Sequence, residues 1–223
     1  MTSTTKLTLA FWLGSMALVA QTTTASVQAT GSATIYVQPD QAQLTVSVTT
    51  QGTTAQDAGQ QNTNLIVIVT KAITNVLGSS GTIQTVSYSV YPRYGNGTQS
   101  STIVGYSATN SFQVTMTDLT LIGSVIDTAN QAGATSVGNL TLGLQNPAPS
   151  LQQALAAASK QALANAAAIA SGLGRTTGAV ISAQQASAYT PVLALVGTAA
   201  PTTQVQTGPV SVSATVTVTA QLQ

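Results

Sequence analysis

Few side chains in this sequence could carry out acid–base chemistry. The chain has no histidine and no cysteine, and its four acidic residues are all aspartates. A serine or threonine nucleophile needs a neighbouring base, which here could only be lysine or aspartate. Ser159 and Lys160 are adjacent, so on a helix their side chains diverge by about 100°, and the pair Ser3 and Lys6 falls in an N-terminal segment that we expect to be removed. The sequence therefore predicts a protein that is not an enzyme, and a hydrolase that uses Ser or Thr with Lys is the remaining alternative.

Metal and cofactor sites are not predicted either. Transition metals in proteins are bound mainly by imidazole and thiolate groups, and the chain has neither. The four aspartates are scattered and lack the ligand spacing of a calcium-binding loop. Asp40 follows Pro39, a position where a short carboxylate accepts backbone N–H groups of a turn. We expect no cofactor and no metal, and we assign Asp40 a structural role.

Tyrosines around one predicted hairpin are the first candidates for a ligand contact. The cluster consists of Tyr88, Tyr91, Arg93, Tyr94 and Tyr106. Aromatic rings can stack on a small apolar or aromatic ligand, but tyrosines on adjacent strands also pair with one another across a sheet. A small-ligand-binding protein that uses this cluster is therefore the second function that the sequence supports.

An apolar segment near the C-terminus is the second candidate site. Val192, Leu193, Leu195 and Val196 lie between two predicted strands, where a connecting loop is usually polar. Such a segment either packs on the core or serves as a contact surface. We favour the contact surface, and we expect these four residues to form a subunit interface in a homo-oligomer.

The N-terminal 25 residues have the layout of a secretory signal peptide. Lys6 precedes the apolar run Leu7–Ala20, and small residues follow it. The run is shorter than the roughly 20 residues that a membrane-spanning helix needs. Cleavage after Ala20 and cleavage after Ala25 both fit, and an uncleaved interfacial anchor is the alternative. The rest of the chain contains no apolar stretch long enough for a bilayer, so we expect no transmembrane segment in the mature protein.

Charge is scarce in the expected mature chain. Of the five basic residues, Lys6 lies in the predicted signal peptide, which leaves four cations against four aspartates. Nucleic acid is not an expected partner, because too few cations remain to neutralise several phosphates. A surface covered mainly by Thr, Ser, Gln and Asn should also respond little to pH and salt.

Several segments alternate apolar and polar residues with a period of two, the pattern of strands with one buried face. The clearest is the C-terminal one. Its apolar residues share one face: Val210, Val212, Ala214, Val216, Val218, Ala220 and Leu222. The same pattern predicts strands over 44–48 and 106–116, and weaker strands over 27–37, 82–91, 137–144 and 179–189.

Three helical segments lie between these strands. The first spans 54–78 and begins with a capping box at Thr54; the second spans 119–133 with Asp118 as N-cap; the third spans 150–173 and begins with another capping box. The third helix is rich in alanine, which allows a close approach to a sheet. We expect its inward residues to be Leu151, Ala154, Leu155, Ala158, Ala162, Ala166, Ile169 and Leu173.

The order of these elements predicts one α+β domain over residues 26–223. Two strands, a helix, two strands, a helix, a strand, a helix and two strands favour a largely antiparallel sheet with three helices packed on one side. The unit strand–strand–helix occurs twice, which hints at an internal β-β-α duplication. No matching residues accompany it.

Particular residue patterns resemble the SIMPL-domain family. The stretch Ala29–Ala33 followed by Pro39–Asp40 is similar to the opening of these proteins, and the stretches 85–92 and Gly105–Asn110 are similar to later parts. The third helix and the closing strand match as well, so the resemblance covers nearly the whole mature chain.

The resemblance implies an exported bacterial protein rather than a particular chemistry. SIMPL-domain proteins are periplasmic or associated with the outer membrane, some are immunogens or are linked to oxidative-stress tolerance, and some form large hollow homo-oligomers. The resemblance thus implies a secreted or periplasmic location, self-assembly and an unidentified protein partner. This sequence differs from the family in its low charge, notably along the third helix, where Ala, Gln and Asn replace acidic residues.

Overall fold

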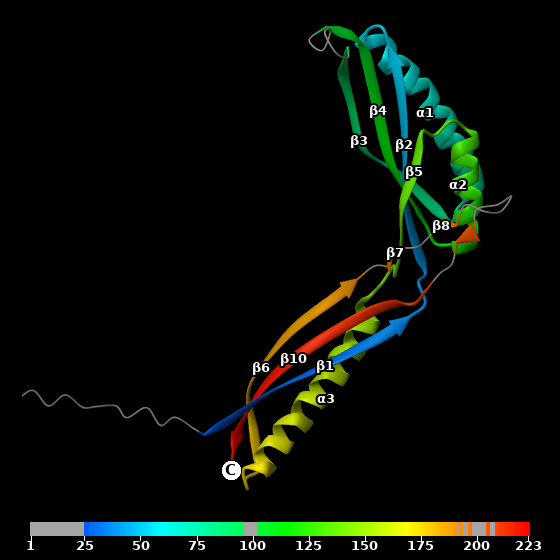
Figure 1. Ribbon diagram of the computed structural model, residues 1–223. Coiled ribbons are helices and arrows are strands. Elements are labelled where there is room, and N and C mark those ends of the chain that lie inside the picture. The colour runs from blue at the N-terminus through cyan, green and yellow to red at the C-terminus, as the bar shows by residue number, and fades with distance from the viewer. Residues whose placement is uncertain (1–24, 96–101, 191, 194–195, 198–203, 206–207) are drawn as a thin grey trace, which may run out of the picture.

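The protein is an elongated molecule with two lobes that meet at an angle (Figure 1). The computed structural model describes residues 25–223 except 96–101, 191, 194–195, 198–203 and 206–207. The predicted signal peptide thus lies almost entirely outside the described residues, and it stays a prediction.

The first lobe, which we call the α3 lobe, consists of a three-stranded antiparallel sheet covered by one helix. Its strands are β1 (Ser26–Val37), β10 (Val210–Leu222) and β6 (Thr177–Thr190), in the order β1-β10-β6. Helix α3 (Ala148–Gly172) lies along one face of this sheet. It packs along β1 and β10 and contacts β6 much less.

The second lobe, the α1–α2 lobe, is built on a five-stranded antiparallel sheet in the order β3-β4-β2-β5-β7. These strands are β2 (Gln41–Gly52), β3 (Gly81–Tyr94), β4 (Ile103–Met116), β5 (Ser136–Gly143) and β7 (Val192–Leu193).

Helices α1 (Ala55–Leu77) and α2 (Ile122–Gln131) cover one face of this second sheet. A 3-10 turn, η2 (Leu119–Leu121), precedes α2. Two short strands, β8 (Val196–Gly197) and β9 (Gln204–Val205), pair with one another nearby. No helix in the described part of the chain combines the length and hydropathy that crossing a membrane requires.

Each lobe has its own hydrophobic core, and the two cores differ in side-chain size. The core of the α1–α2 lobe contains large residues such as Phe112, Leu44 and Ile73. The α3 lobe instead packs small residues of α3 against small residues of β10. Those of the helix are Ala154, Ala158 and Ala162, and those of the strand are Ala214, Val216 and Val218. A small side chain at every fourth position lets α3 lie close to β1 and β10, as the alanine content predicts.

One buried polar residue links α1 to its sheet. Asn62 is fully buried, and its amide nitrogen donates hydrogen bonds to the carbonyls of Val48 and Ala108 at 2.9 and 3.1 Å. These carbonyls belong to β2 and β4, so a single side chain fixes the helix to two neighbouring strands.

The α+β class and the antiparallel pairing are confirmed, but the strands form two main sheets where the sequence analysis expected one. Strands β1 and β2 follow one another in sequence and belong to different sheets, whereas β3 and β4 pair directly. The suggested β-β-α duplication therefore has no counterpart in the pairing. Each main sheet does carry its helices on one face only.

Helix α3 departs from its prediction at both ends. It begins at Ala148, two residues before the expected Ser150, and the backbone N–H of Ala148 donates to the Asn146 side chain at 3.1 Å. At the C-terminal end, Ala170 is fully buried, while Ile169 and Leu173, both expected to face inward, are 45 and 64% exposed. The buried residues recur every four positions up to Ala170, which places Ile169 beside the buried stripe, and Leu173 lies just beyond the end of the helix.

Candidate functional site

The predicted tyrosine cluster is divided between the two faces of its sheet. In the β3–β4 pairing, Tyr88 lies opposite Asn110 and Tyr106 opposite Pro92, on the same face as the buried Ala108. Neighbouring side chains in a strand point to opposite faces, so Tyr91 and Arg93 lie on the other face. The Tyr88 hydroxyl is only 2.9 Å from where a Cβ would stand on Gly59 of α1, which confirms that Tyr88 is on the helix side.

The cluster residues are nevertheless mostly exposed. Tyr88, Tyr91 and Tyr94 have exposed fractions of 53, 66 and 55%. Arg93 donates a hydrogen bond to the side chain of Gln51, so its guanidinium is held against β2. Tyr94 lies beyond a register irregularity of the hairpin. The five residues do not form one surface, and ligand binding by them stays a prediction.

The second predicted site lies at the edge of the α1–α2 lobe. The backbone of Val192 and Leu193 pairs with β5 opposite Leu142 and Thr141, and Val196 belongs to β8. Leu195 lies outside the described residues. Part of this apolar segment thus extends a sheet, and its role as a subunit interface stays a prediction.

Strand β6 is a candidate functional feature that was not among the sites predicted from the sequence. It is 14 residues long, and it pairs with β10 on one side while no described strand pairs with its other side. All its residues except Thr177, Gly178 and Tyr189 are exposed, and it contains no charged residue and no proline. The signal in the sequence was this lack of charge and proline in a predicted strand, combined with weak alternation.

Helix α3 covers little of the face of β6 that points toward it. A hollow of about 250 Å³ lies between them, lined mainly by Leu155 and Ser159 of α3 and by Ala183 and Gln185 of β6. The Ser159 hydroxyl donates to the Leu155 carbonyl at 2.8 Å, so it is engaged within its own helix.

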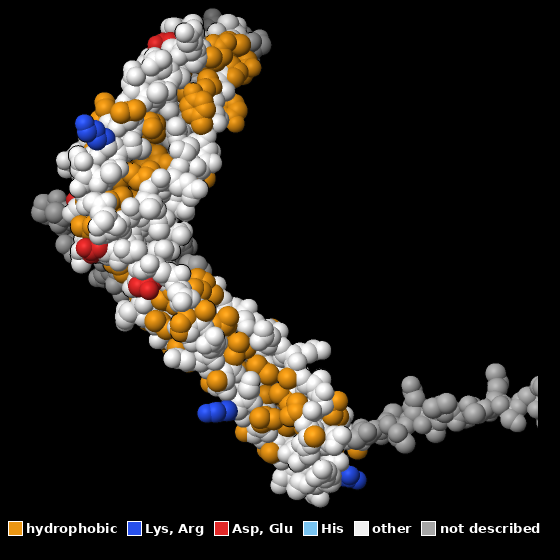
Figure 2. All heavy atoms as spheres, turned by 180° about the vertical axis from the view of Figure 1, so that it is seen from behind, with side chains coloured by type: hydrophobic (Ala, Val, Ile, Leu, Met, Phe, Trp, Pro, Cys, Tyr) orange, Lys and Arg blue, Asp and Glu red, His pale blue; other side chains and the backbone are white. Residues whose placement is uncertain are grey.

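Hydrophobic side chains are also exposed along the α3 lobe (Figure 2). They include Leu163 and Ile169 of α3, Leu173 just after it, and Val180 and Ile181 of β6, with exposed fractions between 45 and 64%. Figure 2 shows few charged side chains among them. The edge of β6 therefore lies in a largely uncharged and partly apolar surface.

The aspartates have structural partners. Asp40 accepts a hydrogen bond from the backbone N–H of Gln145 at 2.7 Å, which ties the β1–β2 connection to the start of the segment before α3. Asp118 accepts one bond from the hydroxyl of Thr120 and a second from its backbone N–H, and these bonds hold the pKa of Asp118 below its usual value of 3.8. Among the described residues, no group of three acidic side chains is placed to hold a metal ion.

Comparison with known proteins identifies relatives over nearly the whole described chain. The profile of the SIMPL family, described as a protein of unknown function (DUF541), matches residues 27–220. The 26 kDa periplasmic immunogenic protein of Brucella melitensis biotype 1 is 30% identical over 192 residues, which cover 83% of this chain and 77% of that protein. The protein of the same name from Brucella abortus strain S19 matches with the same identity and coverage.

Proposed function

Because the chain belongs to the SIMPL family, we propose that it is an exported, non-enzymatic protein of the periplasm that associates with copies of itself through the edge of β6. Two observations support the location. The relatives from Brucella are named periplasmic proteins, and the first 25 residues have the layout of a secretory signal peptide.

The absence of suitable side chains supports a non-enzymatic role. The sequence has no histidine, cysteine or glutamate, which are common general bases and nucleophiles. Ser159, the serine that neighbours a lysine, bonds to its own helix. A role in oxidative-stress tolerance would also have to act through assembly or a partner, because the chain has no thiol to oxidise and Met116, its one methionine beyond the predicted signal peptide, is fully buried.

The observation that best supports self-association is the unpaired edge of β6 among the described strands. An edge strand presents unpaired backbone N–H and C=O groups, and proteins usually protect such edges with charged residues, proline or short length. Strand β6 has 14 residues and neither charges nor prolines. A strand of another chain can therefore add to this sheet by main-chain hydrogen bonds, as in β-augmentation.

A second copy of the chain is the partner that this edge fits best. Strand β6 itself has no charged residue, so pairing the strands of two copies would not place like charges opposite one another. A twofold arrangement uses the same patch on both subunits and would pair β6 antiparallel with its own counterpart. The added strand would also close the hollow between α3 and β6 and cover Val180 and Ile181, which are about half exposed.

Substitution of matched glutamines tests this proposal. Gln184 on β6 and Gln84 on β3 are both exposed residues of edge strands and both lie on the face away from the helices. We expect the wild-type protein to have a solution mass of at least two chains by light scattering. Gln184→Lys should reduce it to the mass of one chain, because a Lys on the edge must be desolvated when a strand is added.

The control Gln84→Lys should keep the wild-type mass. A wild-type monomer at micromolar concentration, or a Gln184→Lys variant that retains the full mass, would contradict association through β6. Dissociation by Gln84→Lys alone would assign the interface to β3.

A further inference from the structure

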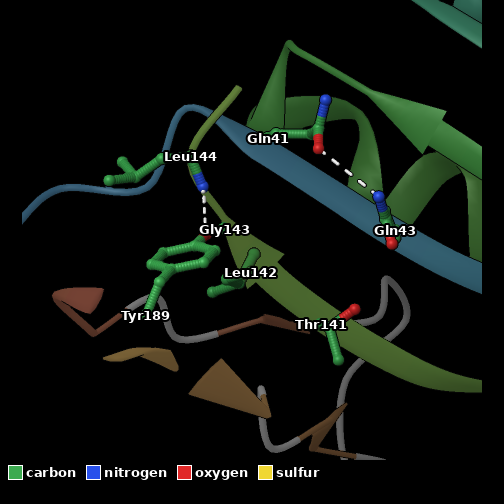
Figure 3. A pocket seen from close by; sticks show the side chains of 7 residues that line it. All are labelled: Gln41, Gln43, Thr141, Leu142, Gly143, Leu144 and Tyr189. Carbon is green, nitrogen blue, oxygen red and sulfur yellow. Dashed lines mark hydrogen bonds between the residues drawn. The ribbon is translucent and has the colours of Figure 1, made fainter. Parts of the chain in front are cut away.

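We propose that the junction of the two lobes binds one neutral sugar ring. A cavity of about 260 Å³ opens there, and its walls come from both lobes (Figure 3). Gln41, Gln43, Thr141 and Gly143 belong to the α1–α2 lobe, while Tyr189 belongs to β6 of the α3 lobe. This site is separate from the tyrosines of the β3–β4 hairpin, and it does not depend on self-association.

The face of the larger sheet that lies away from α1 and α2 forms the floor of the cavity. Gln41 lies opposite Gly143, and Gln43 lies opposite Thr141 in the β2–β5 pairing. Their strand neighbours Ala42 and Leu142 are fully buried in the core. Since side chains alternate along a strand, Gln41, Gln43 and Thr141 all point to the side away from α1 and α2.

The Tyr189 ring forms a wall, and a glycine makes room for it. The Tyr189 hydroxyl accepts a hydrogen bond from the backbone N–H of Leu144 at 2.6 Å, drawn as a dashed line in Figure 3. A Cβ on Gly143 would stand 2.6 Å from the same hydroxyl. The phenol can therefore reach this strand only because residue 143 has no side chain, so its position beside the two glutamines is fixed by backbone contacts.

The polar groups of the cavity are ordered but retain hydrogen-bonding capacity. Gln113 donates to Gln43 at 3.3 Å, and Gln43 donates to the side-chain oxygen of Gln41 at 3.4 Å. Within the described residues, this chain of amides leaves the amide nitrogen of Gln41 without an acceptor. Tyr189 accepts a bond through its oxygen and keeps its own proton to donate. The Thr141 hydroxyl can both donate and accept.

The chemistry of the lining selects a neutral, hydroxyl-rich ligand. None of the described lining residues is charged, and the nearby carboxylate of Asp40 is engaged with Gln145. A charged ligand would find no counter-ion, and a purely apolar one would leave the amides and hydroxyls unpaired at a cost. A sugar ring offers hydroxyls to Gln41 and Thr141, and its C–H face can lie against the Tyr189 ring.

The size of the cavity limits the ligand to one ring. A water molecule occupies about 30 Å³ in the liquid, so a cavity of about 260 Å³ has room for roughly eight to nine waters or a ring of about a dozen non-hydrogen atoms. A ligand of this size with a few hydrogen bonds binds with a Kd on the order of millimolar. A single hexose fits these bounds.

Saturation-transfer NMR of the purified protein with D-glucose tests the site. We expect saturation transfer to glucose and chemical-shift changes at the backbone amides of Gly143 and Leu144, with weaker or no transfer to D-glucuronate and to phenol. Gln41→Ala should weaken glucose binding at least fivefold. The control Gln51→Ala, on the same strand and face but outside the cavity, should leave it unchanged.

Several results would overturn the proposal. These are the absence of transfer to glucose at 20-fold the expected millimolar Kd, stronger binding of glucuronate or phenol than of glucose, and equal binding by wild type and Gln41→Ala. If Gln41→Ala fails to fold, the chemical-shift changes that glucose causes in the wild-type protein test the site on their own. Changes confined to residues away from Gly143 and Leu144 would place the sugar elsewhere and refute the site.

Discussion

Replacing Gly31 by alanine should separate α3 from its sheet. Gly31 lies on β1 beneath the helix, and a Cβ at this position would stand 2.3 Å from both the carbonyl oxygen of Ala158 and the backbone nitrogen of Ala162. Ordinary van der Waals contacts are 3.4–4 Å. Both contacts are backbone atoms of a helix, so neither can rotate away. The helix must shift by about 1 Å or more to accept one methyl group.

The cost of this shift can be worked out from the contacts that it disturbs. Overpacking of a close-packed core costs about 1–3 kcal/mol. The shift also strains two hydrogen bonds beside Gly31, from the Ser32 N–H to Gln161 at 2.9 Å and from Asn165 to the Thr30 carbonyl at 2.8 Å, each worth about 0.5–1.5 kcal/mol. Replacing glycine by alanine also lowers the conformational entropy of the unfolded chain, which stabilises the folded state by about 0.4–1 kcal/mol. We expect a net loss of about 1–5 kcal/mol in the free energy of unfolding, centred on about 3 kcal/mol.

Urea unfolding followed by circular dichroism measures this loss. The one tryptophan, Trp12, lies in the predicted signal peptide, so tryptophan fluorescence would not report on the mature protein. Gly138→Ala is the matched control, because a Cβ on Gly138 meets nothing within 4 Å, and it should change stability by less than about 1 kcal/mol. Hydrogen exchange should also show faster exchange in α3 of Gly31→Ala. Equal stability of the two variants would refute the close approach of helix and strand.

Three further perturbations test other parts of the molecule. Asn62→Ala removes two buried hydrogen bonds between α1 and its sheet and should lower the free energy of unfolding by about 1–3 kcal/mol; a variant as stable as wild type in urea would show that this link is not needed. Hydrogen bonds from Thr120 favour the ionised form of Asp118 and lower its pKa, so their stabilising effect is present above the usual pKa and is lost as pH falls through the lowered one. An NMR titration of Thr120→Ala should therefore find a higher pKa for Asp118 than in wild type, and an unchanged midpoint would refute this cause. If the apolar segment that contains β7 forms a subunit interface, replacing Leu193 and Leu195 by Ser should reduce the mass in light scattering without unfolding the protein. An unchanged mass would show that this segment is not a subunit interface.

Local features of the fold were predictable because they depend on neighbours in sequence. The N-cap of α1 is an example: the Asp57 backbone N–H donates to the Thr54 side chain at 3.1 Å, and the helix begins at Ala55. The alternation in β10 is another, since every second residue from Val210 to Ala220 is buried as the pattern indicates. Both depend on the intrinsic period or on a short-range bond.

The division into two sheets could not be predicted in the same way. Strand β1 pairs with β10, at the other end of the chain, although β2 follows it after only a short connection at Pro39–Asp40. Alternation shows which face of a strand is buried but not which strand lies beside it. The cavity at the junction of the lobes could not be predicted for the same reason. Tyr189 and Gln41 are distant in sequence and line one cavity only through the arrangement of the lobes.

The tyrosine cluster shows the opposite error, in which nearness in sequence suggested nearness in space. Tyr88 and Tyr91 are three residues apart in one strand, so the pleat places them on opposite faces. The alternation of side chains along one strand was enough to separate them. The edge of β6 was overlooked because its importance lies in the absence of charge and of a neighbouring strand.

Cysteine cross-linking tests the central claim, association through β6, most directly. The chain has no cysteine, so a single introduced thiol is unique, and a disulfide forms only when two Cα atoms approach to about 4.4–6.8 Å. We expect at least one of Ser182→Cys, Gln184→Cys and Ala186→Cys to give a disulfide-linked dimer under mild oxidation, with little dimer from Gln84→Cys on β3. Single chains from all three β6 variants, or dimers from the β3 variant alone, would contradict the account.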